Sequence, residues 1–288
     1  MILLLMSSKF KHALNFENTV MIGRQNMHIG HQQLQDCLTK FDYKDADVTK
    51  IMSKQETDTN IYAEGLFKTL GASKVDAVDA STYENASIIH DMNEPIPDRH
   101  KEGYDVVVDS GTLEHVFNFP QAIKNCMEIT AVGGHFIGIY PCNNFFGHGF
   151  YQFSSETFYR VLSDDNGFEV KDVIIFVDEP NGAFYSIPDT SEEHHRITFK
   201  NSKPVLLYVI AKRLEKKPIL VKNPQQMDYA AMKWKGNKPV KKTVKKRATL
   251  KSKTPQYFKN IIKAVLNKKT HDDRSYFNRS YFKSYTLK

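Results

Sequence analysis

The sequence predicts an α/β protein built on a mostly parallel sheet. Between residues 19 and 212, short apolar runs rich in Val and Ile alternate with segments of helical period, as when helices connect parallel strands. Several runs end at Gly or Asp, and ligands of such sheets bind beyond the carboxyl ends of the strands. The 288 residues leave room for one such domain and a further segment.

Seven apolar runs are the candidate strands. They span residues 19–22, 74–79, 86–90, 104–108, 135–140, 168–177 and 205–211. A long polar loop without helical period separates the last two, so we expect them to pair antiparallel at one side of the sheet.

Four segments have the amphipathic period of a helix. They span residues 31–41, 61–70, 120–129 and 154–162. Gly71 marks the end of the second, and Ser154 is placed to cap the fourth. The polar stretch 42–60 is interpreted as an insertion.

The charge divides the chain into two parts. Residues 213–288 hold 22 Lys and Arg against 4 Asp and Glu, a balance of +18, while the preceding 212 residues have 18 against 29, a balance of −11. We therefore expect a domain over residues 1–212 and a basic tail over residues 213–288. With only three cysteines and no paired spacing, we expect a reduced compartment and no structural zinc.

The tail has the composition of a polyanion-binding or membrane-surface segment. The Lys-rich residues 233–253 predict a mobile linker, residues 255–266 a short amphipathic helix, and Arg274-Ser-Tyr-Phe recurs from Arg279. The apolar residues 2–6 are too short to span a bilayer and lack the flanks of a secretory signal. We expect a cytoplasmic protein, with peripheral membrane association through the tail as one use of its charge.

The residues at the strand ends suit an adenosine ligand. Gly23, Asp79, Asp91 and Asp109 follow four candidate strands. A carboxylate after the second strand can accept hydrogen bonds from both ribose hydroxyls, and one after the third can accept from an adenine amino group. The alternative is that each Asp merely caps a loop.

With these residues in place, the chain resembles the class I S-adenosylmethionine (SAM)-dependent methyltransferases over residues 15–212. The resemblance is carried by residues 75–79, by His90-Asp91-Met-Asn93, by Tyr104-Asp-Val-Val-Val-Asp-Ser-Gly-Thr-Leu-Glu-His-Val116 and by residues 132–137. It implies a Rossmann-like sheet of seven strands in the order 3-2-1-4-5-7-6, with helices on both faces. It also implies methyl transfer with SAM as cofactor.

The same resemblance assigns cofactor contacts. Asp79 would bind the ribose and Asp91 the adenine. Asp109, Ser110 and Gly111 would line the floor beside the methionine part of SAM.

The loop after the first strand departs from the family pattern. The family has a Gly-rich loop there, whereas this chain has the single Gly23, followed by Arg24. Arg24 could clamp the carboxylate of SAM in place of backbone contacts, or be a solvated residue at the start of a helix.

The candidate catalytic residues follow the fourth and fifth strands. His115 and His148 are candidate bases for a hydroxyl acceptor, with His148 preferred because glycines flank it, and Glu114 could orient either imidazole. Residues 141–153 mix amide, imidazole and aromatic side chains, which suits a substrate pocket or lid, or an aromatic core cluster. No metal site is expected, since the adjacent His194 and His195 diverge in an extended loop.

These observations favour a methyltransferase that modifies an oxygen of a small-molecule or saccharide acceptor. One alternative is a nucleic-acid methyltransferase that uses the basic tail, although the acidic body would repel phosphates. The other is a non-catalytic binding or scaffold protein that keeps the fold, for which the poor first glycine motif is the evidence.

Overall fold

The computed structural model describes residues 1–54, 58, 60–179, 182–191, 197–227, 229, 276–277 and 283–284. The helices are α1 (Ile2–His12), α2 (His31–Lys40), α3 (Val48–Ile51), α4 (Glu64–Thr69), α5 (Phe119–Ile129) and α6 (Ser155–Val161), with short 3-10 helices η1 (Asp98–His100), η2 (Leu113–His115) and η3 (Asp164–Asn166). The strands are β1 (Asn18–Ile22), β2 (Lys74–Asp79), β3 (Ile88–Ile89), β4 (Tyr104–Ser110), β5 (Thr130–Asn143), β6 (Phe168–Val177), β7 (Phe184–Ser186), β8 (Phe199–Lys200), β9 (Val205–Arg213), β10 (Tyr276–Phe277) and β11 (Lys283–Ser284).

The strand order confirms the expected fold class. The main sheet runs β11-β7-β6-β9-β5-β4-β1-β2-β3. The seven strands predicted from the sequence are β1 to β6 and β9. Numbered 1 to 7 in chain order, they lie in the order 3-2-1-4-5-7-6, and β9 is antiparallel to both β5 and β6. The edge strands β7 and β11 were not predicted, and neither was the separate pair of β8 with β10.

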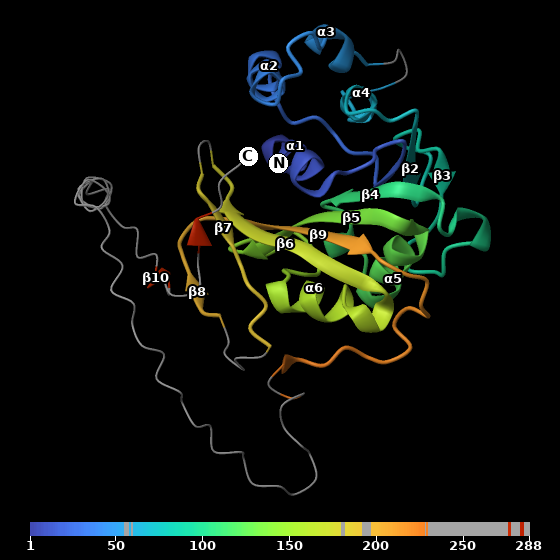
Figure 1. Cartoon of the computed structure of the whole chain (residues 1–288), viewed down its shortest axis with the longest axis vertical. Coiled ribbons are helices and arrows are strands. Elements are labelled where there is room, and N and C mark those ends of the chain that lie inside the picture. Colours follow the sequence, from blue (N-terminus) through green and yellow to red (C-terminus); the bar gives the residue numbers. More distant parts are fainter. Residues whose placement is uncertain are drawn as a thin grey trace, which may run out of the picture.

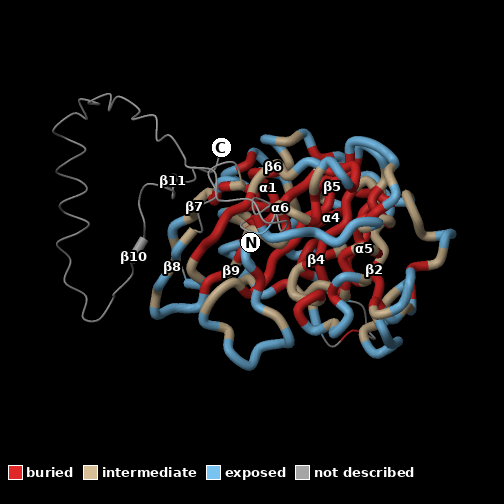
Figure 2. Tube along the Cα trace, turned by 90° about the horizontal axis from the view of Figure 1, so that it is seen from below, coloured by how far each residue is buried: buried red, intermediate tan, exposed pale blue. Residues whose placement is uncertain are grey.

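Helices cover both faces of the sheet. Figure 1 shows α1 to α4 on one side and α5 with α6 on the other. Side chains alternate along the central strand, so that Val107 packs in the core beneath α5 and α6 while Val106 and Val108 pack in the core beneath α1. Figure 2 shows the resulting buried centre. Burial on both faces explains why the strands are continuous apolar runs.

The apolar opening of the chain is a core helix, which sequence reasoning did not predict. Leu4 and Met6 of α1 are wholly buried against the sheet. The hydroxyl of Tyr208 on β9 donates to Ser8 Oγ at 2.7 Å, which fixes α1 across the central strands. Among the described residues, no helix is long and apolar enough to cross a bilayer.

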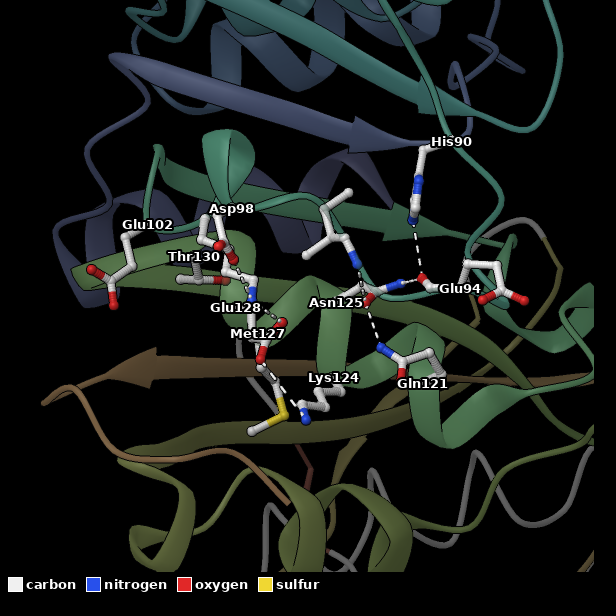
Figure 3. A network of polar contacts seen from close by, with 12 residues as sticks. His90, Glu94, Asp98, Glu102, Gln121, Lys124, Asn125, Met127, Glu128 and Thr130 are labelled. Carbon is white, nitrogen blue, oxygen red and sulfur yellow. Dashed lines mark hydrogen bonds and ion pairs between the residues drawn. The ribbon is translucent and has the colours of Figure 1, made fainter. Parts of the chain in front are cut away.

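One buried amide attaches α5 to the loop after β3. The side chain of Asn125 accepts from Gln121 and donates to the carbonyl of Glu94 (Figure 3). It also accepts from the backbone N–H of Ile96 and donates to the carbonyl of Met92. Its four polar positions are thereby used, as a buried amide requires. This network holds the loop that carries Asp91 at the edge of the sheet.

The globular body extends beyond the expected boundary at residue 212. Arg213 ends β9 with its guanidinium buried, donating to the carbonyl of Thr130 at 2.6 Å and pairing with Glu102. Ile219 and Met227 are also buried against the body. The expected linker at 233–253, the expected helix at 255–266 and the pair His194-His195 lie outside the described residues.

A buried histidine in β5 predicts a pH dependence of stability. Burial, and then the charges of Lys212, His12 and Lys171, lower the pKa of His135 from 6.5 to about 4. In the folded protein His135 stays neutral down to about pH 4, whereas in the unfolded chain it is protonated below pH 6.5. The free energy of unfolding therefore has its full value above pH 6.5 and falls by about 3 kcal/mol as the pH drops towards 4. In urea unfolding, His135→Phe should lose that much less stability than wild type between pH 7 and 4.

His31, exposed on α2, provides the matched control. His31→Phe should follow the wild-type pH profile. Equal acid sensitivity of His135→Phe and wild type would contradict the assignment.

Candidate functional site

A cleft of about 1100 Å³ opens where the carboxyl ends of β1, β2 and β4 meet. This is the point at which the strand order reverses, where open α/β sheets bind ligands. Of the residues singled out from the sequence, the cleft is lined by Gly23, Arg24, Asp79, Ser110, Gly111 and His115. Asp91, Asp109, Glu114 and His148 are not among its lining residues.

The single glycine after β1 has a specific structural role. Gly23 adopts a left-handed φ of +69°, and a Cβ there would lie 2.5 Å from Thr112 Oγ1. Thr112 in turn donates to the carbonyl of Ile22 at 2.7 Å, which joins the loop after β1 to the loop after β4. A cradle of backbone at the floor of the cleft therefore forms with one glycine instead of several.

Asp79 is the carboxylate that the structure places in the cleft. It ends β2 partly exposed and accepts from the backbone N–H of Ser81 at 2.9 Å, which orients it at the cleft wall. Asp91 instead turns its carboxylate to Asn93, whose backbone and side-chain N–H groups both donate to Oδ1 and lower its pKa. The structure thus brings Asp79, but not Asp91, to the cleft.

Asp109 is a buried structural residue. Its side chain is fully inaccessible and accepts from the backbone N–H groups of Thr112 and Leu113, so it holds the turn that precedes η2. Burial raises its pKa to about 7, against the opposing effect of those donors. The expectation for Asp109 is therefore corrected: of the three residues 109–111, Ser110 and Gly111 line the cleft and Asp109 does not.

Arg24 borders the cleft, but its guanidinium is used within the protein. Nε donates to Glu64 at 2.7 Å, and Nη1 and Nη2 donate to Asp58 at 2.7 and 3.1 Å. The guanidinium also lies 3.9 Å from the ring centroid of Tyr62. These contacts favour neither of the two roles considered from the sequence: Arg24 is a buried cation that ties the insertion to the loop after β1.

A carboxylate and two imidazoles meet beside the cleft. Glu114 and His115 belong to η2, while His148 comes from the loop after β5. His148 Nε2 lies 3.6 Å and His115 Nε2 4.0 Å from Glu114 Oε1. Glu114 is buried, whereas both imidazoles are about half exposed. The structure thus brings together the three residues that the sequence proposed as catalytic.

Electrostatics at this trio reflect the burial of the carboxylate. Burial, and then the neighbouring Asp109, raise the pKa of Glu114 to about 7. Burial, and then His148, lower the pKa of His115. No hydrogen-bond donor among the described residues reaches the buried Oε2 of Glu114. Burying a carboxylate without a hydrogen-bond partner lowers the stability of the fold. A cation or a hydrogen-bond donor bound beside Glu114 would offset that loss.

The loop after β5 is held to Glu114 by its backbone. The N–H groups of Phe150 and Tyr151 both donate to the carbonyl of Glu114, at 2.9 and 3.3 Å. A Cβ on Gly149 would lie 2.9 Å from that carbonyl oxygen and 3.1 Å from His115 Nδ1, so the close approach needs glycine. This attachment places His148 against the carboxylate.

The polar side chains of this loop mainly fold the loop itself. Asn144 donates to the carbonyls of Asn201 and Lys203, Gln152 accepts from the N–H of Phe145, and Tyr151 donates to the carbonyl of Phe117. The aromatic rings that remain exposed beside the trio are Phe117, Phe146 and Phe150. The loop therefore offers an apolar rim around two imidazoles.

Much of the cleft wall was not foreseen from the sequence. It includes Met1, Ile2 and Leu3 at the start of α1, the segment Gln25 to Ile29, Gln33, Asp36 and Cys37 of α2, and Glu84 and Asp178. Helical period predicted α2, but period alone cannot tell which exposed side of a helix borders a ligand site. Ser110 Oγ donates to Met1 Sδ at 2.9 Å, a contact between residues 109 positions apart that no local pattern reveals.

Comparison with known proteins gives similarity of structure alone. The chain matches no family model and no curated protein sequence. It is similar to a SAM-dependent methyltransferase of Thermotoga maritima (14% identity, 74% of this chain and 89% of that chain, TM-score 0.38). It is also similar to the N-methyltransferase NodS of Bradyrhizobium japonicum in complex with S-adenosyl-L-homocysteine (12% identity, 74% of this chain and 84% of that chain, TM-score 0.37). A third similar structure is that of a branched-chain polyamine synthase of Thermus thermophilus (11% identity, 78% of this chain and 58% of that chain, TM-score 0.38).

The fold class is defined by this chain's own strand order. A sheet in the order 3-2-1-4-5-7-6 with an antiparallel seventh strand, and a cleft at its reversal point, is the Rossmann-like fold that the resemblance to class I SAM-dependent methyltransferases implies. The low identities and TM-scores above add no argument about activity.

Proposed function

We propose that the protein is a SAM-dependent methyltransferase that modifies a hydroxyl oxygen of a small-molecule or saccharide acceptor. One observation carries the proposal: the cleft at the reversal point of the sheet lies directly beside the trio Glu114, His115 and His148, with His115 belonging to both. A cofactor site and a proton-accepting site are thereby adjacent.

The residues of the cleft fit the parts of SAM. Asp79 offers a carboxylate for the ribose hydroxyls, and the backbone at Gly23 and Gly111, both at positive φ, leaves room for close approach. Ser110 adds a hydroxyl at the floor. SAM, when bound there, supplies a methyl carbon on a sulfonium, which an acceptor oxygen attacks in line with the breaking carbon–sulfur bond.

The trio is placed to manage the proton of the acceptor. A hydroxyl must lose its proton as its oxygen becomes methylated, and imidazole is the side chain suited to accept a proton near neutral pH. Two half-exposed imidazoles with a buried carboxylate behind them supply proton acceptors and a compensating negative charge. A group that moves a proton in this way contributes typically 10²–10⁴-fold to the rate.

The rim of the trio favours an acceptor with an apolar face. Phe117 and Phe150 pack edge to face with ring centroids 5.4 Å apart, and both are largely exposed. A saccharide has hydroxyls and an apolar ring face, so it can contact an aromatic ring and an imidazole together. These rings support a saccharide or an apolar small molecule as acceptor.

Calorimetric titration with SAM tests the proposal. The wild-type chain should bind one SAM, and Asp79→Asn should weaken binding by roughly tenfold, since a hydrogen bond to a charged group contributes about 1.5–3 kcal/mol. Asp91→Asn is the matched control and should retain wild-type affinity, because Asp91 does not line the cleft. Absence of SAM binding to the folded wild type would instead favour a scaffold protein that keeps only the fold.

We further propose that the basic tail holds a cytoplasmic enzyme to an anionic membrane surface. The +18 balance of residues 213–288 supports this, since each basic residue near such a surface contributes about 1 kcal/mol. The full chain should co-sediment with phosphatidylserine-containing vesicles and be released by salt. Tight binding to RNA or DNA without vesicle binding would support the nucleic-acid alternative.

A further inference from the structure

The three side chains beside the cleft form a group of converging metal ligands. One ligand atom each from Glu114, His115 and His148 lie within 4.8 Å of one another. The pair distances of 3.6 and 4.0 Å to Glu114 Oε1 are too long for hydrogen bonds but close to the spacing of ligands around one cation. Ligands about 2.1 Å from a common ion lie roughly 3.0–3.4 Å apart, so each side chain needs to move by less than about 1 Å.

A second observation indicates that the group is built for a ligand. The side chain of Glu114 is 1% exposed, and its Oε2 is buried without a hydrogen-bond partner among the described residues. Within the described part of the chain, neither the His148 nor the His115 imidazole forms a hydrogen bond, since their Nε2 atoms lie 3.6 and 4.0 Å from Glu114 Oε1, so each imidazole has a ring nitrogen available as a ligand. Glu114 forms no ion pair with a Lys or Arg side chain among the described residues, and a metal ion would supply a positive charge beside this buried carboxylate.

The backbone around the group keeps the ligands converging. His115 follows Glu114 in the short helix η2, and His148 is brought in by the loop whose N–H groups bind the Glu114 carbonyl. Gly149 permits that approach, and Gly111, at φ +99°, leaves room next to Glu114 Oε1, which lies 3.3 Å from where its Cβ would be. The half-exposed imidazoles leave the remaining coordination positions open toward the cleft and solvent.

We propose that Glu114, His115 and His148 bind one divalent first-row transition-metal ion, such as Zn²⁺, Mn²⁺ or Fe²⁺, with open positions for a hydroxyl ligand. Two imidazole nitrogens and one carboxylate oxygen favour these ions over Mg²⁺ and Ca²⁺, which prefer all-oxygen ligands. This differs from the expectation of no metal site, which considered the three cysteines and the pair His194-His195.

The ion would act on the acceptor, and this role rests on the proposed function. A hydroxyl coordinated to the ion is more acidic, so its O–H bond breaks with the electron pair kept on oxygen and the proton released to solvent. The oxygen is then the nucleophile, held beside the cleft. Under this proposal the imidazoles serve as ligands, and the ion performs the activation that a free base would otherwise provide.

Metal binding can be measured without any acceptor or SAM. The full chain, freed of metal by a chelator and then desalted, is titrated with Co²⁺ while its visible d–d absorption is recorded, and with Zn²⁺ by calorimetry. One ion should bind per chain, and Glu114→Gln and His148→Ala should each weaken binding by at least roughly tenfold. Mg²⁺ at the same concentration should not displace Co²⁺.

Two control variants make the result specific. His100→Ala changes a histidine near Lys74 and Asp76 at the opposite, amino end of β2, and should bind Co²⁺ like wild type. The double variant His194→Ala with His195→Ala should also bind like wild type. Loss of Co²⁺ binding in that double variant, or equal binding by wild type and Glu114→Gln, would overturn the proposal. Because SAM binding is measured separately, its absence would refute the methyltransferase assignment while leaving this metal test intact.

Discussion

Glu114→Gln should lower the rate of methyl transfer by about 10²–10⁴-fold while leaving the affinity for SAM unchanged. The amide keeps the shape of the side chain but cannot ionise, whereas the Glu114 carboxyl, whose pKa burial raises to about 7, is partly ionised, and so negatively charged, at neutral pH beside His115 and His148. Either role of the trio, proton acceptance or metal binding, depends on that charge. The measurement is the rate of S-adenosylhomocysteine release with an acceptor that the wild type methylates, together with calorimetry for SAM.

Stability separates a functional loss from a structural one. Oε2 of Glu114 has no hydrogen-bond partner among the described residues, so the amide should not lower the free energy of unfolding. Glu94→Gln, an exposed substitution of the same chemistry, should keep the wild-type rate. A Glu114→Gln protein with full activity would show that the trio takes no part in the reaction.

Arg24→Met should destabilise the fold by about 3–5 kcal/mol, because it leaves buried carboxylate charge without its cation. Arg24 and Asp58 are 7% and 4% exposed, and Glu64 shares the same guanidinium. The methionine retains an apolar stem of similar length, so the loss reports the charge and its hydrogen bonds. The free energy of unfolding in urea, followed by circular dichroism, measures it.

An exposed ion pair offers the matched control for this change. Lys44 and Asp42 form an ion pair of similar length whose side chains are 68% and 85% exposed, so Lys44→Met should cost less than about 1 kcal/mol. The double variant Arg24→Met with Asp58→Asn should recover part of the loss. If Arg24→Met were as stable as wild type but bound SAM roughly tenfold more weakly, Arg24 would be the carboxylate clamp.

The sheet was predictable because its signals are local. Buried parallel strands are continuous apolar runs, and the bounds of β2 and β6 agree with those expected from the sequence. Helix α1 was missed because residues 2–6 are apolar on every side, a pattern that resembles a membrane or signal segment as much as a buried helix. The edge strands β7 and β11 were missed because two or three residues are too few to show a period.

The candidate site was predictable only where sequence order determines position. Asp79 and Ser110 end strands β2 and β4 and Gly111 follows β4, so their place at the cleft comes with the sheet. The role of Arg24 depends on Asp58 and Glu64, 34 and 40 residues away, and a buried ion pair between such positions has no local signature. The meeting of His115 with His148 likewise depends on how the loop after β5 returns to η2.

The carbonyl of Glu114 is the anchor of the loop that follows β5, whereas the floor of the cleft is formed by the loops after β1, β2 and β4. Under the proposed function, His148 and the exposed rings of Phe146 and Phe150 therefore come from a stretch that does not line the cleft, whereas Glu114 and His115 come from the stretch after β4 that does. Residues 145–147 can change in size or chemistry while His148, Gly149 and the two N–H groups bound to Glu114 stay in place. Under the proposed function, acceptor choice could then diverge through residues 145–147 of that loop without a change in the residues that line the cleft.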